Sequence, residues 1–377
     1  MSTTFLLYYM LPFIATMTAA FIVVAIYDVY QSHKQQSLYG GFDPTSGRKK
    51  EIRRLAGQIL TGQSGAIVSV FSEERTKILG YLDDPSNSEK LYGEHAKALI
   101  FSRLNINLLF FENGKDKCEP YQFWEQALKP LENKIETDSS LDKIYQTCKE
   151  NQFEKFYLDS LITQLKQEGL RLVLMLDKFD ELLNSNLDKP IFFATLRELA
   201  SSRHPSSLSL ITSGDISLKQ FHEETKNEGS PFLAFMVGCE IILRPLSDNE
   251  VALLLSEERF SKPERQLIKE ITGGHVFLIR LAISVLKDVK ESNESVVREE
   301  FCTKVKTILT SSWDSRICQA IVTIAKGETV PDSLNYEIDL LRKQGFVKTD
   351  KDNNWQISPS ILVDCIGNQT RQELCKP

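Results

Sequence analysis

Residues 171–183 have the sequence Arg-Leu-Val-Leu-Met-Leu-Asp-Lys-Phe-Asp-Glu-Leu-Leu, and this stretch decides the fold. An unbroken apolar run from Leu172 to Leu176 leads directly into Asp177. Such a run is typical of a parallel strand buried on both faces, and a carboxylate at its carboxyl end lies where α/β sheets bind ligands. The stretch therefore predicts a buried strand whose Asp177 either helps to hold a metal ion or starts the next helix.

Length and composition indicate an ordinary globular protein. The chain has 377 residues, of which 42% are hydrophobic and 25% charged, enough for two or three domains. A net charge of −6 gives no support for a strongly basic nucleic-acid surface. The seven scattered cysteines, without a Cys-x-x-Cys pair, predict free thiols in a reducing compartment. The five histidines lack the spacing of metal ligands.

The N-terminal end predicts a membrane anchor. No charged residue occurs from Phe5 to Tyr27, and a transmembrane helix needs about 20 apolar residues. Basic residues follow this segment and none precedes it, so the positive-inside rule places the body of the protein in the cytoplasm and a short N-terminus outside. We therefore expect a single-pass inner-membrane protein with a transmembrane helix at 5–27 and a polar linker at 28–41. A cleaved signal peptide would need a basic start and a shorter apolar run.

Strands and helices alternate after the linker. Apolar runs and helical periodicity predict strands at 66–71, 105–111, 172–176, 208–212 and 239–243, and helices at 48–60, 76–82, 121–131, 153–167 and 191–199. This alternation predicts an α/β fold with a mostly parallel, doubly wound sheet. Helices are expected next at 247–255, 263–271 and 275–289. The last part, with helices at 315–325 and 335–344 and a hairpin at 346–357, has the order of a winged helix.

From about residue 42 to 367 the chain resembles the STAND-type AAA-like P-loop NTPases of bacterial signalling and defence. The resemblance rests on the run at 172–183, on Leu-Arg-Pro-Leu-Ser at 243–247 and on Thr-Gly-Gly-His-Val at 272–276. It implies a P-loop NTPase-like domain at 42–243, a helical lid at 244–305 and a winged-helix domain at 306–377. It also implies that ATP or ADP with Mg²⁺ would contact Ser69, Glu74, Arg75, Thr76, Asp177 and His275, with Thr76 and Asp177 as the metal ligands.

The phosphate-binding loop departs from the family pattern. A P-loop needs Gly-x-x-x-x-Gly-Lys-[Ser/Thr], because its backbone N–H groups surround phosphate and its lysine neutralises charge. Here Ser69 and Glu74 replace the glycines, Arg75 replaces the lysine and Thr76 keeps the hydroxyl. A carboxylate about 4 Å from a phosphate oxygen costs about 4 kcal/mol at an effective dielectric constant of about 20.

The Walker B run is altered as well. Asp177 remains, but Lys178 replaces the glutamate that polarises the attacking water in the family, so no catalytic residue is assigned. These changes predict a site without ATPase activity, and without a cofactor unless the loop still binds ATP or ADP with Mg²⁺. Glu74 and Lys178 are predicted either to form an ion pair across the pocket or to be solvated independently. Asp180 suits a helix N-cap better than a metal ligand.

The sequence thus predicts a membrane-anchored, catalytically inactive STAND/AAA-like protein. It would act as a scaffold, sensor or regulatory subunit with a protein partner, and self-association is a further option. One alternative is an active nucleotide-dependent switch. Another is a membrane-bound DNA-binding regulator, which the mixed charges of the helix at 335–344 disfavour, as does the acidic net charge.

Overall fold

The computed structural model describes residues 46–112, 118–184, 187, 189–201, 207–226, 236, 238–256, 258–289, 293–312, 315–367 and 375. Within these ranges no helix is long and apolar enough to cross a membrane. The predicted transmembrane helix at 5–27 and the linker at 28–41 lie outside the described residues.

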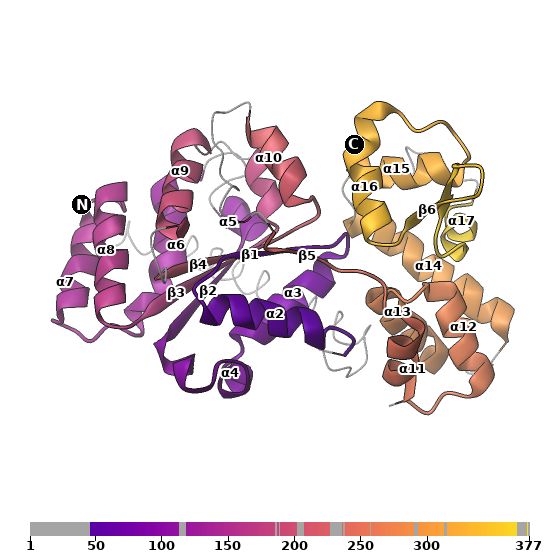
Figure 1. The fold of residues 1–377 in the computed structure, drawn as a ribbon, viewed down its shortest axis with the longest axis horizontal. Helices are drawn as coiled ribbons and strands as arrows, with labels where there is room; N and C mark the ends of the chain where they lie inside the picture. Colours follow the sequence, from indigo (N-terminus) through magenta and orange to yellow (C-terminus); the bar gives the residue numbers. More distant parts are fainter. Residues whose placement is uncertain are drawn as a thin grey trace, which may run out of the picture.

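The centre of the fold is a five-stranded parallel sheet with the strand order β2-β3-β4-β1-β5 (Figure 1). The strand that carries Asp177, β3, lies between β2 and β4, and the strand before the phosphate-binding loop, β1, lies between β4 and β5. The predicted parallel α/β sheet is therefore confirmed. The strands are β1 (Gly65–Val68), β2 (Leu99–Asn105), β3 (Arg171–Asp177), β4 (Leu208–Gly214) and β5 (Glu240–Ile242).

Helices cover both faces of this sheet (Figure 1). Along β3, Leu174 and Leu176 belong to one hydrophobic core, whereas Val173 and Met175 belong to another on the opposite face. A strand covered on both faces has no polar side, which explains the unbroken apolar run. One face carries α2 (Lys49–Leu60), α3 (Ser72–Asp83) and α4 (Pro85–Tyr92); the other carries α5 (Ile106–Glu112), α6 (Pro120–Glu132), α7 (Ser140–Glu150), α8 (Lys155–Gln167), α9 (Lys189–Ser201) and α10 (Leu218–Lys226).

The prediction of a strand at 105–111 is wrong. The strand is β2, which ends at Asn105, and the apolar residues after it form α5. The Asn105 side-chain oxygen accepts a hydrogen bond from the Asn107 N–H group at 3.1 Å, a local turn that ends the strand and starts the helix. Because β2 is an edge strand with the exposed Arg103, it lacks the apolar run expected of a central strand.

Helices follow the last strand of the sheet, and a small C-terminal part completes the chain. The helices are α11 (Asp248–Ser256), α12 (Lys262–Thr272), α13 (Val276–Asp288) and α14 (Glu294–Ser312). The C-terminal part contains α15 (Ser315–Ala325), α16 (Asn335–Lys343), the antiparallel strands β6 (Val347–Thr349) and β7 (Trp355–Ile357), and α17 (Ile361–Ile366). The predicted order of helix, helix and hairpin is therefore present.

The prediction that the cysteines are free thiols is wrong for the C-terminal part. Cys302 of α14 forms a disulfide with Cys365 of α17, and Cys318 of α15 forms one with Cys375. The partners are 63 and 57 positions apart, so only the packing of the chain end against α14 and α15 brings them together. Free thiols remain at Cys118, Cys148 and Cys239.

Gly274 provides a test of how tightly the helices pack against the end of β5. Its φ is +83°, and a Cβ atom at this position would lie 2.5 Å from the backbone oxygen of Leu246. We expect Gly274→Ala to lower the free energy of unfolding by about 2–4 kcal/mol, because backbone strain and a clash with an immobile carbonyl add together. Urea denaturation measures the change.

The matched control is Gly57→Ala inside α2, where no atom lies within 4 Å of an added Cβ. Alanine is the better helix former, so this variant is expected to gain up to about 1 kcal/mol. Equal destabilisation of the two variants would show that the Gly274 backbone does not approach Leu246 as closely as described.

Candidate functional site

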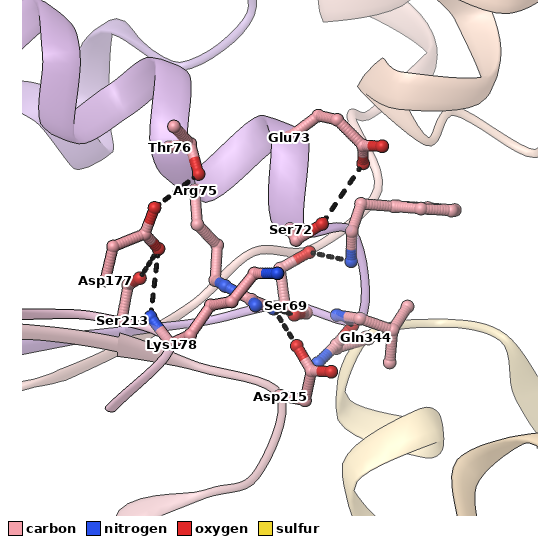
Figure 2. A network of polar contacts seen from close by, with 12 residues as sticks. Ser69, Ser72, Glu73, Arg75, Thr76, Asp177, Lys178, Ser213, Asp215 and Gln344 are labelled. Carbon is pink, nitrogen blue, oxygen red and sulfur yellow. Dashed lines mark hydrogen bonds and ion pairs between the residues drawn. The ribbon is translucent and has the colours of Figure 1, made fainter. Parts of the chain in front are cut away.

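The loop after β1 is shorter than a phosphate-binding loop. Only residues 69–71 separate β1 from α3, because the helix already begins at Ser72 (Figure 2). Glu74, Arg75 and Thr76 therefore lie inside the helix and not in a loop before it. Without glycines at Ser69 and Glu74, the chain forms a tight turn instead of the wide one that surrounds a phosphate group.

The N–H groups of this loop bind other parts of the protein. Ser69 N–H donates to the Gly214 carbonyl at 3.3 Å, and Phe71 N–H donates to the Ser69 hydroxyl at 3.2 Å. Val70 N–H donates to Oε1 of Gln344, at the end of α16, at 3.1 Å (Figure 2). These are the groups that would face an anion in a P-loop, and each is already satisfied within the chain.

Arg75 occupies the centre of the site. Its side chain is 1% exposed, donates to the Ser69 carbonyl and forms an ion pair with Asp215, just beyond β4 (Figure 2). Burial alone lowers the pKa of Arg75, but the carboxylates of Asp215, Asp180 and Asp177 outweigh it, so that the pKa lies above its ordinary value. The guanidinium is therefore charged, and its charge is already balanced by carboxylates of the protein.

Glu74 has a different partner from the one predicted. Arg48 Nε donates to Glu74 Oε1 at 2.7 Å, and both side chains are buried. Arg48 also donates to the Arg244 carbonyl at 2.7 Å, which connects α2 to the segment before α11. The predicted ion pair between Glu74 and Lys178 is therefore wrong: because Glu74 lies within α3, its carboxylate reaches the start of α2.

Asp177 and Thr76, the two residues predicted as Mg²⁺ ligands, are in direct contact. Thr76 Oγ1 donates to Asp177 Oδ2 at 2.5 Å, and the Ser213 hydroxyl and the Lys178 N–H group donate to Oδ1 (Figure 2). Hydroxyl and carboxylate oxygens are suitable Mg²⁺ ligands, but Mg²⁺ bound in this way also needs phosphate oxygens and water. The two side chains therefore fit a metal ion only together with a nucleotide.

Lys178 takes the place of the expected catalytic glutamate. It has a φ of +57° directly after β3, and its half-buried side chain runs toward the loop that carries Ser69 (Figure 2). Within the described part of the chain its ammonium group has no ion-pair partner. A lysine ammonium cannot accept a proton from an attacking water, so this position supplies no general base.

Asp180 is a half-buried member of the site with a buried Oδ1 atom, and it is not a helix N-cap, which corrects the sequence-based interpretation. It lies inside the 3₁₀ helix η2 (Phe179–Asn184), and no described group donates a hydrogen bond to its Oδ1. A Cβ atom on Gly214 would lie 2.6 Å from this oxygen, so glycine makes room for it. Burial raises the pKa of Asp180 to about 7, Asp215 adds to the shift and Arg75 opposes it.

His275 does not reach the phosphate-binding loop directly. Its ring is buried and stacks on Phe346 with ring centres 3.8 Å apart, and Phe346 in turn packs edge-on against Phe71. Burial, followed by the nearby Arg48, lowers the pKa of His275 to about 3, so the ring is neutral. The predicted nucleotide-contacting histidine therefore packs against the C-terminal part.

The sequence did not single out Asp215 or Gln344. The sequence contained a signal for Asp215, because this residue directly follows β4, a predicted strand, at the sheet edge where ligands bind. Gln344 had none, since it is 274 positions from the residue that it caps. Only the packing of α16 against the loop reveals its role.

The fold matches that of known ATPases. No protein-family model and no curated protein matches the chain. The Walker-type ATPase PABY2304 of Pyrococcus abyssi is similar over 85% of this chain and 95% of its own, with a TM-score of 0.56 and 13% identity. This chain has the fold of the P-loop ATPases. The Aeropyrum pernix ORC2 protein, solved in ADPNP and ADP complexes, is similar over 87% of this chain and 94% of its own, with a TM-score of 0.49 and 12% identity.

Arg75 is expected to be essential for stability. Removing one partner of a buried ion pair leaves the other charge unpaired, so Arg75→Ala should lower the free energy of unfolding by about 3–5 kcal/mol. The exposed Arg53 of α2 is the matched control, and Arg53→Ala should change it by less than about 0.5 kcal/mol. Chemical denaturation of both variants measures the difference. A loss below 1 kcal/mol for Arg75→Ala would argue against the buried carboxylate cluster.

Asp180 predicts a pH-dependent stability. In the folded protein the pKa of Asp180 is about 7, whereas an aspartate side chain in an unfolded chain has a pKa of 3.8. The folded state therefore binds this proton more tightly than the unfolded state does. This group therefore stabilises the fold least when it is ionised, and its contribution falls as pH rises from about 4 to about 7.

Asp180→Asn imitates the protonated acid. Its free energy of unfolding relative to the unaltered chain should therefore rise across this window, by up to about 4 kcal/mol. The titration of His275 affects both proteins alike and cancels. Urea denaturation from pH 4 to pH 8 gives the difference, and a flat difference would contradict the shift.

Proposed function

We propose that this chain is a catalytically inactive P-loop ATPase-fold protein of the STAND type, whose phosphate site is filled by its own side chains. The observation that carries the proposal is the buried Arg75–Asp215 ion pair beside a loop whose N–H groups are bound within the protein. A nucleotide would have to break these contacts and supply new ones of equal strength. The site would then act through shape and domain contacts, not through hydrolysis.

The charge at Lys178 supports loss of hydrolysis independently of binding. General-base catalysis contributes about 10²–10⁴-fold to a rate, and it needs a group that can accept a proton. Lys178 directly follows Asp177, at the position where the family that the sequence resembles carries a glutamate. Even a nucleotide that entered the site would therefore find no carboxylate at position 178 to activate water.

The C-terminal part is proposed to be a winged helix used for contacts within the chain. Glu337 of α16 is 1% exposed and accepts hydrogen bonds from Gln220 of α10 at 3.2 Å and from Arg316 of α15 at 2.6 Å. The helix that would read DNA in a winged helix is thus packed against the ATPase-like part. This supports an internal docking role over DNA binding.

We further propose a location in the cell and a kind of partner for this protein. The uncharged segment at 5–27 would anchor the protein in the inner membrane, with its body in the cytoplasm. The protein would serve as a scaffold, sensor or regulatory subunit in bacterial signalling or defence. It would act through a protein partner or through self-association.

A second candidate function is a nucleotide-gated switch. One observation favours it: the Thr76–Asp177 hydrogen bond keeps both metal ligands of a P-loop site in contact. Opening of the loop and release of Arg75 from Asp215 would then restore a place for phosphate. The two functions differ in whether ATP or ADP binds at all.

Calorimetric titration of the full-length chain with ATP and ADP, with and without Mg²⁺, tests the proposal. We expect no detectable binding at millimolar nucleotide and no gain in thermal stability. A ligand present at 100 times its Kd would stabilise the fold by about 2.7 kcal/mol, which a thermal scan detects readily.

Micromolar binding that disappears in Asp177→Ala would overturn the inactive-site proposal and support the switch. Binding that survives Asp177→Ala would place the nucleotide elsewhere. The variant Gln344→Ala, which frees the Val70 N–H group, is the useful comparison. Under the proposal it still does not bind nucleotide, because Arg75 remains paired with Asp215.

A further inference from the structure

The disulfides of the C-terminal part differ in their exposure. Cys302 of α14 is half-buried, whereas its partner Cys365 of α17 is fully buried. In the other pair, Cys318 and Cys375 are both buried, with 3% and 7% of their surface exposed. A disulfide exchanges with a small thiol only where one of its sulfur atoms can be approached. The Cys302–Cys365 pair is therefore the more reactive of the two.

Helix α17, which contains Cys365, packs close to the loop at 69–71. Leu362 of α17 belongs to the same buried hydrophobic cluster as Phe71 of the loop, Phe277 of α13 and Phe346 of the C-terminal part. Phe71 stacks on Phe277 at 4.1 Å between ring centres and packs edge-on against Phe346 at 5.6 Å. These rings hold the loop in place. A shift of α17 would remove Leu362 from its packing against them.

The segment before α17 also packs against the turn between α12 and α13. A Cβ atom on Gly273 would lie 3.2 Å from Cδ of Pro359, so these two residues are in close contact. The Cys302–Cys365 disulfide joins α17 to α14, and Cys302 Sγ lies 4.0 Å from the carbonyl oxygen of Ile361 at the start of α17. One covalent bond thereby fixes a helix that packs with the rings around the loop and that directly follows the segment in contact with the turn before α13.

We propose that the Cys302–Cys365 pair is a redox switch that controls how firmly the loop at 69–71 is held. In the disulfide form α17 is fixed, the rings stay packed and the Val70 N–H group stays bonded to Gln344. In the dithiol form α17 is held by packing alone, and the loop opens more often. The inference rests on the proposed function in one respect, because it takes the filled loop as the element under control.

The chemistry is thiol–disulfide exchange with a small disulfide of the glutathione type. The Cys302 thiolate attacks one sulfur of that disulfide, forms a mixed disulfide and releases one small thiolate. The Cys365 thiolate then attacks the Cys302 sulfur and releases the second. The two cysteine thiols are oxidised, the small disulfide is reduced to two thiols, and the two protons pass to the released thiolates.

The full-length chain is compared after incubation with oxidised and with reduced glutathione. Alkylation and mass spectrometry establish which cysteines are free, and hydrogen exchange is followed at the Val70 and Phe71 amides. We expect reduction to open Cys302–Cys365 first and to speed exchange at these amides by about tenfold or more, because local opening becomes easier. Amides of the central strand β3 should be unchanged, which separates a local effect from global unfolding.

Two double variants decide the assignment. Cys302→Ser with Cys365→Ser should give fast exchange at Val70 whatever the glutathione state. Cys318→Ser with Cys375→Ser is the matched control and should keep the response. Equal exchange in the oxidised and reduced chain, or a response that survives loss of Cys302 and Cys365, would overturn the inference. Nucleotide titration in both states tests the proposed function separately, since neither exchange result depends on nucleotide.

Discussion

A buried guanidinium among carboxylates is the interaction on which the rest of this site depends. Taking Arg75 out of water costs several kcal/mol, and the ion pair with Asp215 offsets that cost. Gly214, which has no side chain, leaves space for the Asp180 carboxyl group. The ends of β3 and β4 and the first turns of α3 therefore hold one another in place without a bound ligand.

The same loop is also fixed from the other end of the chain. Gln344 accepts from the Val70 N–H group, and Phe346 packs against Phe71, so the turn between α16 and β6 packs against the loop. Phe277 adds a stacked ring from α13. Three segments far apart in sequence, the loop at 69–71, α13 and the turn after α16, are thus in contact with one another.

Particular residues show how far the sequence could predict this site. Local motifs singled out Thr76 and Asp177, because each lies at the carboxyl end of a predictable strand or in the helix after it, and the structure places them in contact. The pairing of Glu74 did not, since it depends on whether α3 begins before or after this residue. The edge strand β2 was misplaced for a related reason, because an exposed edge weakens the apolar pattern.

The sequence by itself determined a parallel α/β sheet with Asp177 at the end of a central strand, since apolar runs and their spacing are local properties of a chain. It also showed Ser69, Glu74 and Arg75 at the positions where the family that the sequence resembles carries two glycines and a lysine. Only the tertiary structure decided that Arg75 pairs with Asp215, that Gln344 caps the loop and that Cys302 meets Cys365. The physical reason is that charges, hydrogen bonds and thiols select partners by distance in space, which packing sets across long separations in the sequence.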